Sequence, residues 1–435
     1  MKKVIISGMI GNGLEWYDYA LYAQYFYIIS NNFFPDNHLN SIFTFAVFAI
    51  GSAARPFGGA LLGYIGDLFG RKISLVIGIL MMSIPTAIIG ILPSYKSIGL
   101  LSPIILVIIR LLQGLALGGE FSGCISYVVE SSTHSKRGLA GSTSFISMCL
   151  GILLGVGVTG LLSKILSEND LLSWGWRLPF IAGLFIGFIG IYIRKNLSET
   201  PIYKIAKSKG YLSRSPIRDT ILYHKASMLI ATLIYINVCV PFYALTVLMK
   251  DYMLNLGYSA SQIDTVYTIT LISMIIGIPI SAHISDKIGR KPVLVFSSIC
   301  LIIIIYPLFS VLNSSSKDYS LLIVLEILFA LITGCYMGPI PTALVELFPT
   351  KIRFTGVALS YNTSVAIFGS TLPMIASIFR QYLGNYTNLT AYYMLLLIVF
   401  CFVFLLFYYK ESYKKDISLD ISYETGDSIH NIQVS

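Results

Sequence analysis

Six ionisable residues stand inside long apolar stretches of this sequence: Glu15, Asp18, Arg55, Arg110, Glu120 and Glu326. At the centre of a bilayer each would cost ~2.5–3.5 kcal/mol on insertion scales, so such residues pair with one another or line a polar cavity. Some of them could be ion pairs that only fix helix packing. Because five of the six lie in the first half of the chain, we expect a shared site there.

Glu15 and Asp18 are three residues apart, which places both carboxylates on one face of a helix. Two carboxylates this close in a low-dielectric setting cannot easily both ionise, so the pair predicts a proton-binding site. Arg110 stays charged and binds carboxylates in a fork, which makes it a counter-ion or a clamp for a substrate carboxylate. Glu120 lies ~80° further round the same helix and could face the same cavity. We therefore predict proton coupling through Glu15, Asp18 and Glu120.

Aromatic residues crowd the stretch that holds the two carboxylates, among them Trp16, Tyr19 and Tyr22. Aromatic faces attract ammonium groups, but aromatic residues are also common at membrane interfaces. The histidines are scattered, and the six cysteines lack CxxC spacing. We therefore expect neither a metal centre nor a cofactor.

Membrane-spanning helices must hold these charges. The chain has 435 residues, 55% hydrophobic and only 12% charged, which is too little polar surface for a soluble globule of this size. Apolar runs near the ~20 residues needed to cross a bilayer occur about twelve times. We predict an all-α integral membrane protein with spans near residues 8–30, 41–65, 73–92, 102–126, 139–162, 176–195, 225–250, 262–284, 292–312, 320–343, 354–379 and 390–409.

Lysine and arginine residues gather in alternate loops of this predicted topology. They fall mostly on the inner side when the N-terminus is placed inside, and positive loops stay in the cytoplasm. We therefore predict that both termini are cytoplasmic. The net charge of +9 is spread over these loops and forms no continuous basic face, so a nucleic-acid partner is not expected.

A charged loop occurs twice in the sequence, once as Asp67-Leu68-Phe69-Gly70-Arg71-Lys72 and once as Asp286-Lys287-Ile288-Gly289-Arg290-Lys291. The two copies are 219 residues apart, and Arg110, Glu130 and Arg137 precede Glu326, Glu346 and Arg353 by 216 residues. The spacing predicts a duplicated domain. We expect a first six-helix bundle over 1–195, a polar linker over 196–224, a second bundle over 225–410 and a disordered tail over 411–435.

Several motifs together resemble the metabolite:proton symporter branch of the major facilitator superfamily, and most of all its proline/betaine members. They are the repeated loop, GNGLEWYDYALY (11–22), RPFGGALLGYIGDLFGRK (55–72), RLLQGLALGGEFSG (110–123), WGWRLPF (174–180) and ELFPTKIRFTGVALSYN (346–362). The resemblance implies two pseudo-symmetric six-helix bundles around a midplane site, alternating access and a proton as coupling ion. The short tail departs from osmolyte members with a long coiled-coil extension, which puts osmotic sensing in doubt.

The resemblance also implies that the repeated loops act as a latch. We expect gating by Asp67, Gly70, Arg71, Glu130, Arg137, Asp286, Gly289 and Arg290. As pairs on the cytoplasmic rim, these charges would contribute only ~1 kcal/mol each.

These observations favour a membrane transporter with a small-molecule substrate and a proton as its partners. We expect a monomeric symporter in a bacterial inner membrane that imports a small zwitterionic metabolite. The alternatives are an importer of a di- or tricarboxylate such as 2-oxoglutarate or citrate, and a non-transporting membrane sensor. An enzyme is not expected, because no nucleophile, base or metal group converges. The expected substrate-binding residues are Trp16, Tyr19, Tyr22, Arg55, Arg110, Glu326, Tyr361 and Asn362.

Overall fold

The computed structural model describes residues 2–35, 40–313, 318–383, 387–413 and 416–417, and these residues form helices and connecting turns without strands. The first half contains α1 (Lys2–Gln24), α2 (Phe26–Phe33), α3 (Asn40–Leu68), α4 (Arg71–Ile91), α5 (Tyr95–Ile98), α6 (Leu101–Glu130), α7 (Arg137–Ile165), α8 (Glu168–Ser173) and α9 (Leu178–Lys195). The second half contains α12 (Lys225–Ile234), α13 (Ile236–Tyr243), α14 (Met249–Asn255), α15 (Ala260–Ile288), α16 (Arg290–Asn313), α17 (Tyr319–Met337), α18 (Ile340–Glu346), α19 (Arg353–Ser364), α20 (Leu372–Leu383) and α21 (Thr387–Phe407). Short π-helical turns, Ala244–Leu248 and Val365–Gly369, continue α13 and α19.

Ten helical segments of the described chain are long and apolar enough to cross a membrane. They coincide with the third to twelfth predicted spans, while α1 and α3 coincide with the first two. Large apolar side chains such as Phe188, Ile303 and Phe407 are exposed, as expected where a helix faces lipid. The twelve-helix prediction therefore fits the structure.

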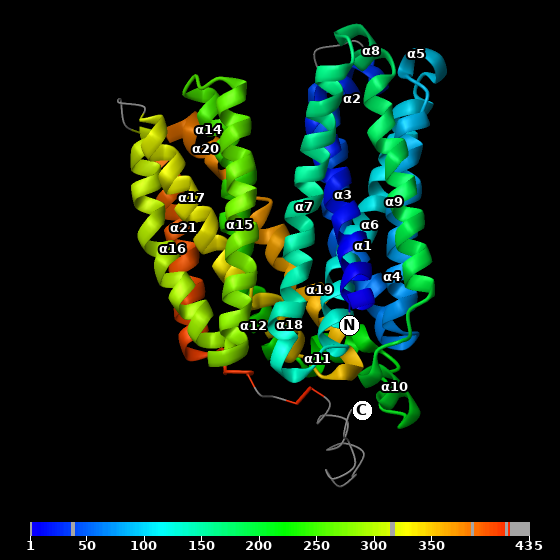
Figure 1. The fold of residues 1–435 in the computed structure, drawn as a ribbon, viewed down its shortest axis with the longest axis vertical. Helices are drawn as coiled ribbons and strands as arrows, with labels where there is room; N and C mark the ends of the chain where they lie inside the picture. The colour runs from blue at the N-terminus through cyan, green and yellow to red at the C-terminus, as the bar shows by residue number, and fades with distance from the viewer. Residues whose placement is uncertain (1, 36–39, 314–317, 384–386, 414–415, 418–435) are drawn as a thin grey trace.

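The two halves form separate helix groups that converge at one end (Figure 1). They lie apart at the end that carries α5, α8 and α14, and they meet where the N-terminus, α18 and α19 lie. The second of these ends also carries α10 (Pro201–Ser208) and α11 (Pro216–Tyr223), which belong to the segment between the halves. We call it the linker end.

Close helix packing joins the halves toward the linker end. There α3 and α6 pack against α19, and α7 packs against α15 and α18. Glycine makes the approach possible: a Cβ atom on Gly63 of α3 would lie 2.8 Å from the Cα atom of Thr355 on α19. The structure is thus closed at the linker end.

The predicted domain boundaries coincide with helix ends, since α9 ends at Lys195 and α12 begins at Lys225. The linker is more than a spacer, because α11 packs against α3, α12 and α19. The predicted disorder of the tail is wrong for its first residues. Ile417 is 2% exposed and its carbonyl oxygen accepts a 3.0 Å hydrogen bond from Arg353. The rest of the predicted tail, apart from 411–413 and 416, lies outside the described residues.

Candidate functional site

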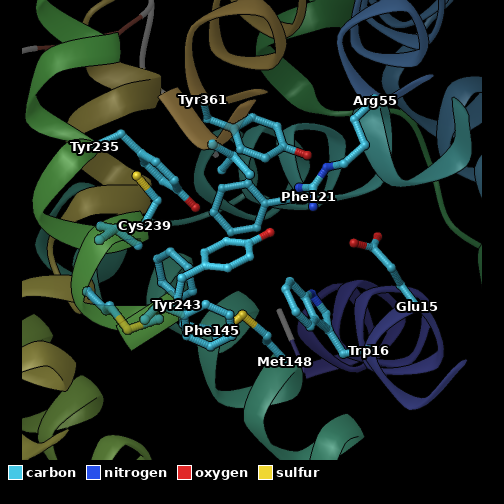
Figure 2. A pocket seen from close by; sticks show the side chains of 14 residues that line it. Glu15, Trp16, Arg55, Phe121, Phe145, Met148, Tyr235, Cys239, Tyr243 and Tyr361 are labelled. Carbon is cyan, nitrogen blue, oxygen red and sulfur yellow. The ribbon is translucent and has the colours of Figure 1, made fainter. Parts of the chain in front are cut away.

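A cavity lies between the two halves near the middle of the helices and encloses about 410 Å³ of space not filled by atoms. Both halves contribute to its wall, which is mainly aromatic (Figure 2). The ring of Trp16 meets Phe242 edge-on with 5.4 Å between centroids, and Phe121 lies 5.0 Å from Tyr361. The remaining lining residues are Phe145, Met148, Tyr235, Val238, Cys239, Tyr243, Met337 and Val365, together with Glu15 and Arg55.

Glu15 and Arg55 are the two charged residues of this lining, one acidic and one basic. Figure 2 shows the carboxylate and the guanidinium facing the same space from α1 and α3. They are not in salt-bridge contact, and Glu15 makes no hydrogen bond within the described part of the chain. The cavity therefore presents separated opposite charges inside an aromatic wall.

A second cavity of about 420 Å³ adjoins the first and shares Glu15, Arg55 and Tyr243 with it. It also contains Asp18 and Arg110, which form a buried ion pair of 2.9 Å. The structure thus places both predicted proton-binding carboxylates, Glu15 and Asp18, at one cavity.

Asp18 accepts hydrogen bonds from three side chains, unlike Glu15. Besides Arg110, Thr86 donates to it at 2.8 Å and Gln113 at 2.9 Å. Arg110 in turn lies 3.7 Å from the ring centroid of Tyr22. Of the two roles predicted for Arg110, the structure shows that of a counter-ion, to Asp18. Tyr22 packs its ring against this arginine and does not line the first cavity.

Glu120 does not line either cavity, because it pairs with a different cation. Arg194 of α9 forms a buried ion pair with it and also donates to the backbone carbonyls of Leu75 and Ser7. The prediction that Glu120 faces the cavity is therefore wrong for this conformation. Arg194 stands among basic residues at the end of the predicted span 176–195, so its sequence context did not distinguish it from the other loop cations.

The other predicted binding residues fall in three places. Tyr19 lines the second cavity and Tyr361 the first, while Asn362 lies in the contact between α19 and the first half. Glu326 lies inside the second half, where Thr270 donates to it at 3.2 Å, and it is absent from the lining of both cavities. Its role in binding the substrate therefore has no support from this conformation.

The first repeated loop bonds across the halves at the linker end. Asp67 accepts the backbone N–H groups of Phe354 and Thr355, at 3.1 and 2.8 Å, in the first turn of α19. A carboxylate is favourable there because the first N–H groups of a helix lack partners and carry partial positive charge. Arg71 lies 3.3 Å from Asp67 and 3.2 Å from Glu130.

The second loop repeats this arrangement in the opposite direction. Asp286 accepts the backbone N–H groups of Gly138 and Leu139, at 2.8 and 2.9 Å, in the first turn of α7. Arg290 lies 2.8 Å from Asp286 and 3.4 Å from Glu346. Each half therefore holds the first turn of a helix in the other half.

The other predicted gating residues, Glu130, Arg137, Gly70 and Gly289, also lie at the linker end. Arg353 lies 2.8 Å from Glu130, and the backbone carbonyl of Arg137 accepts a 2.9 Å hydrogen bond from Thr342. Gly70 and Gly289 have φ of +122° and +109°, a region that favours glycine.

The predicted weakness of these contacts is wrong. The side chains of Asp67 and Arg71 are 0% exposed, so the pair belongs to the interior and not to a solvated rim. Breaking a buried pair by removing one partner costs about 3–5 kcal/mol. We call the contacts of Asp67, Arg71, Glu130, Asp286, Arg290 and Glu346 the latch.

Two further carboxylates, Glu199 and Glu411, extend the latch and were not among the predicted gating residues. Glu199 accepts the backbone N–H of Lys72 at 3.1 Å, and Glu411 accepts those of Arg290 and Lys291 at 3.0 and 2.9 Å. Each caps the helix that follows a repeated loop. They are 212 residues apart and each precedes a hydroxyl residue, Thr200 or Ser412, so self-alignment of the halves could have found them.

Burial distinguishes these two caps. Glu199 is half-buried, and burial raises its pKa above the usual value of 4.5, although hydrogen bonds from the backbone of Thr200 and Lys72 act in the opposite direction. Glu411 is exposed. Equivalent positions of the repeat thus differ in solvent exposure.

Comparisons with known proteins agree with the repeat. A family described as Sugar (and other) transporter matches residues 4–220, and the Major Facilitator Superfamily matches residues 228–420. A glycine betaine/proline/ectoine/pipecolic acid transporter of Dickeya dadantii is 34% identical over 92% of this chain and 81% of its own length. The proline/betaine transporter of Escherichia coli K12 is 33% identical over the same shares.

Solved structures show the same fold. A double-tryptophan mutant of the xylose transporter XylE has a TM-score of 0.82 at 17% identity, covering 97% of this chain and 98% of its own. The inward-open conformation of XylE from E. coli gives 0.63 at 18% identity, covering 95% of this chain and 97% of its own.

Proposed function

Because this chain belongs to the major facilitator superfamily, we propose that it is a proton-coupled symporter that imports a small zwitterionic metabolite of the proline or betaine type. The observation behind the choice of substrate is the pair Glu15 and Arg55, which face one aromatic cavity as separated opposite charges. Relatives named as proline/betaine transporters cover most of this chain and support the same class.

The cavity matches a zwitterion group by group. The guanidinium of Arg55 binds the substrate carboxylate, since its planar fork suits a carboxylate. The ammonium end lies by Glu15 among the rings of Trp16 and Tyr243, where cation–π attraction contributes about 0.5–2 kcal/mol. A quaternary ammonium has no N–H to donate, so rings and a nearby carboxylate are suitable partners for it.

The proton binds at the second cavity, which shares Glu15 with the first. Asp18 and Glu15 form the proton-linked pair, and Arg110 lies 2.9 Å from Asp18 as its counter-ion. Protonation of either carboxylate changes the charge next to the substrate, so proton binding and substrate binding influence each other. This is the linkage that symport requires.

Transport proceeds by rocking of the two halves around the cavity. The linker end faces the cytoplasm, with both termini on that side, and the latch favours the outward-facing state. Proton and substrate together lower the free energy of the inward-facing state. We further propose that the protein works as a monomer in a bacterial inner membrane and releases its substrate chemically unchanged.

Uptake into proteoliposomes tests this function. Purified protein, given an inward proton gradient, should accumulate labelled glycine betaine or proline but not 2-oxoglutarate or citrate. Arg110 is already paired with Asp18, so the first cavity offers one cation and not the two that a dicarboxylate needs. Uptake of dicarboxylates alone would overturn the choice of substrate, and no uptake of any compound would favour the membrane sensor.

A further inference from the structure

Side chains of α19 make hydrogen bonds to the first half at the floor of the first cavity. Tyr361 donates its hydroxyl to the carbonyl of Leu117 at 2.8 Å, and the amide of Asn362 donates to the carbonyl of Gly118 at 2.7 Å. The third bond runs from Nε of Arg55 to Oδ1 of Asn362, at 3.4 Å. We call these three bonds the floor contacts, and they are separate from the latch.

The fit at the floor depends on glycine in α3. A Cβ atom on Gly59 would lie 2.7 Å from Nδ2 of Asn362, closer than real Cβ atoms come. Asn362 is 1% exposed and Tyr361 is equally buried. The floor contacts therefore form only while α19 is pressed against α3 and α6, which is the closed state of the linker end.

Arg55 belongs to the floor and to the substrate cavity at once. Its guanidinium lines both cavities and lies next to the hydroxyl of Tyr361, 5.9 Å from the ring centroid (Figure 2). Within the described residues it has no salt bridge, so no carboxylate of the protein holds it in place. The 3.4 Å bond to Asn362 is long, whereas a charged carboxylate would bind the same guanidinium more tightly.

We infer that Asn362 couples substrate binding to opening of the linker end. The substrate carboxylate draws Arg55 away from Asn362 and Tyr361, which weakens the floor contacts. The empty transporter is held closed by the same arginine that recognises its substrate. Only the part that names the carboxylate rests on the proposed function; the role of Asn362 in holding the empty state does not.

The distance between the halves at the linker end tests this inference. Spin labels at Ser135 and Lys287, which are exposed on opposite halves, report it in protein whose native cysteines are replaced. Asn362→Ala removes both the bond from Arg55 and the bond to Gly118, so it should shift the substrate-free protein toward long distances by roughly tenfold or more in equilibrium. Glycine betaine should then lengthen the distances much less than in the wild type.

Asn362→Asp should behave differently from Asn362→Ala. The carboxylate loses the amide donor to the carbonyl of Gly118 but gains an ion pair with Arg55. The substrate-free distances should therefore stay shorter than in Asn362→Ala, and more glycine betaine is needed to lengthen them. A variant that merely misfolds cannot produce this result. Asn237→Ala is the matched control, because Asn237 is equally buried but bonds to Ser298 within its own half.

The outcomes separate this inference from the proposed function. If Asn362→Ala and Asn362→Asp leave the substrate-free distances as in the wild type, Asn362 has no coupling role. If glycine betaine and proline change the label distance neither in the wild type nor in any variant, the proposed substrate is wrong. The substrate-free distances of the variants still decide the role of Asn362.

Discussion

The two halves of the molecule make matching contacts in the latch, but they contribute different kinds of side chain to the two cavities. At the linker end, Asp67 and Arg71 have close counterparts in Asp286 and Arg290, and each aspartate holds the first turn of a helix in the opposite half. In the middle of the membrane the correspondence ends. The first half supplies every charge of the two cavities, whereas the second half contributes rings, a thiol and apolar side chains.

This difference separates two tasks of a transporter. In a latch with equal contacts on both sides, both sets of contacts must break when the linker end opens. Charge recognition needs fixed distances between Glu15, Arg55 and Asp18, and these are easiest to keep within one rigid bundle. We infer that the first half holds the substrate and proton while the second half closes over them.

Removal of the Asp18 carboxylate should have the largest effect on transport. The amide of Asp18→Asn cannot bind and release a proton, and the substitution leaves Arg110 buried without its counter-ion. Gradient-driven accumulation of glycine betaine should fall by roughly 100-fold or more, the scale for loss of a proton-transfer group. Uptake under a pH gradient measures it, and retained counterflow exchange would show that the fold survives.

Glu326→Gln is the matched variant, since Glu326 occupies the repeat position of Arg110 in the second half. It lines neither cavity, so uptake should stay within about twofold of the wild type, a typical range for a site outside the chemistry. Loss of coupling in Glu326→Gln would mean that the second half also carries the chemistry.

Arg55→Gln should have the next largest effect. Loss of the charged partner of the substrate carboxylate removes about 1.5–3 kcal/mol and raises KM for glycine betaine about 10–100-fold. Initial uptake rates at varied substrate concentration separate KM from kcat. Lys250→Gln serves as control: that cation lies 3.6 Å from the ring centroid of Tyr267 in the second half and outside both linings, so its KM should not change.

Asp67→Asn and Asp286→Asn should have smaller effects that equal one another. Asparagine keeps one acceptor for the two backbone N–H groups but loses the ion pair with Arg71 or Arg290. Because Arg71 still pairs with Glu130 and Arg290 with Glu346, the loss is smaller than for a fully broken buried pair, and each variant should favour the inward-facing state by about 1–3 kcal/mol. The label pair at Ser135 and Lys287 measures the shift. A response in only one of the two variants would show that the gate is not symmetric.

The sequence predicted the repeated parts of this protein better than the unrepeated ones. Twelve spans and two halves follow from apolar length and from one motif that occurs twice, because both signals can be read from short stretches of sequence. The latch was implied by the family resemblance. The partners of buried charges are not local. Glu120 belongs with Arg194, which no spacing within one helix reveals, and Arg110 belongs with Asp18 only once α1 and α6 are packed. The burial of Asp67 likewise depends on α19 from the other half.

The two caps of the latch should show the smallest difference, because burial separates Glu199 from Glu411. The raised pKa of Glu199 means that the folded protein binds this proton more readily than the unfolded chain. Its contribution to stability is therefore fully present below pH 4.5 and is lost as pH rises through the folded pKa.

Glu199→Gln removes this titration, so the Tm of the wild type minus that of Glu199→Gln should be larger at pH 4 than at pH 7, by roughly 2 °C. Thermal unfolding in detergent at the two pH values measures it. Glu411→Gln removes the equivalent cap from an exposed position and keeps the comparison matched. If both variants show the same dependence on pH, burial is not its cause, and the two copies of the latch are alike in their electrostatics as well as in their geometry.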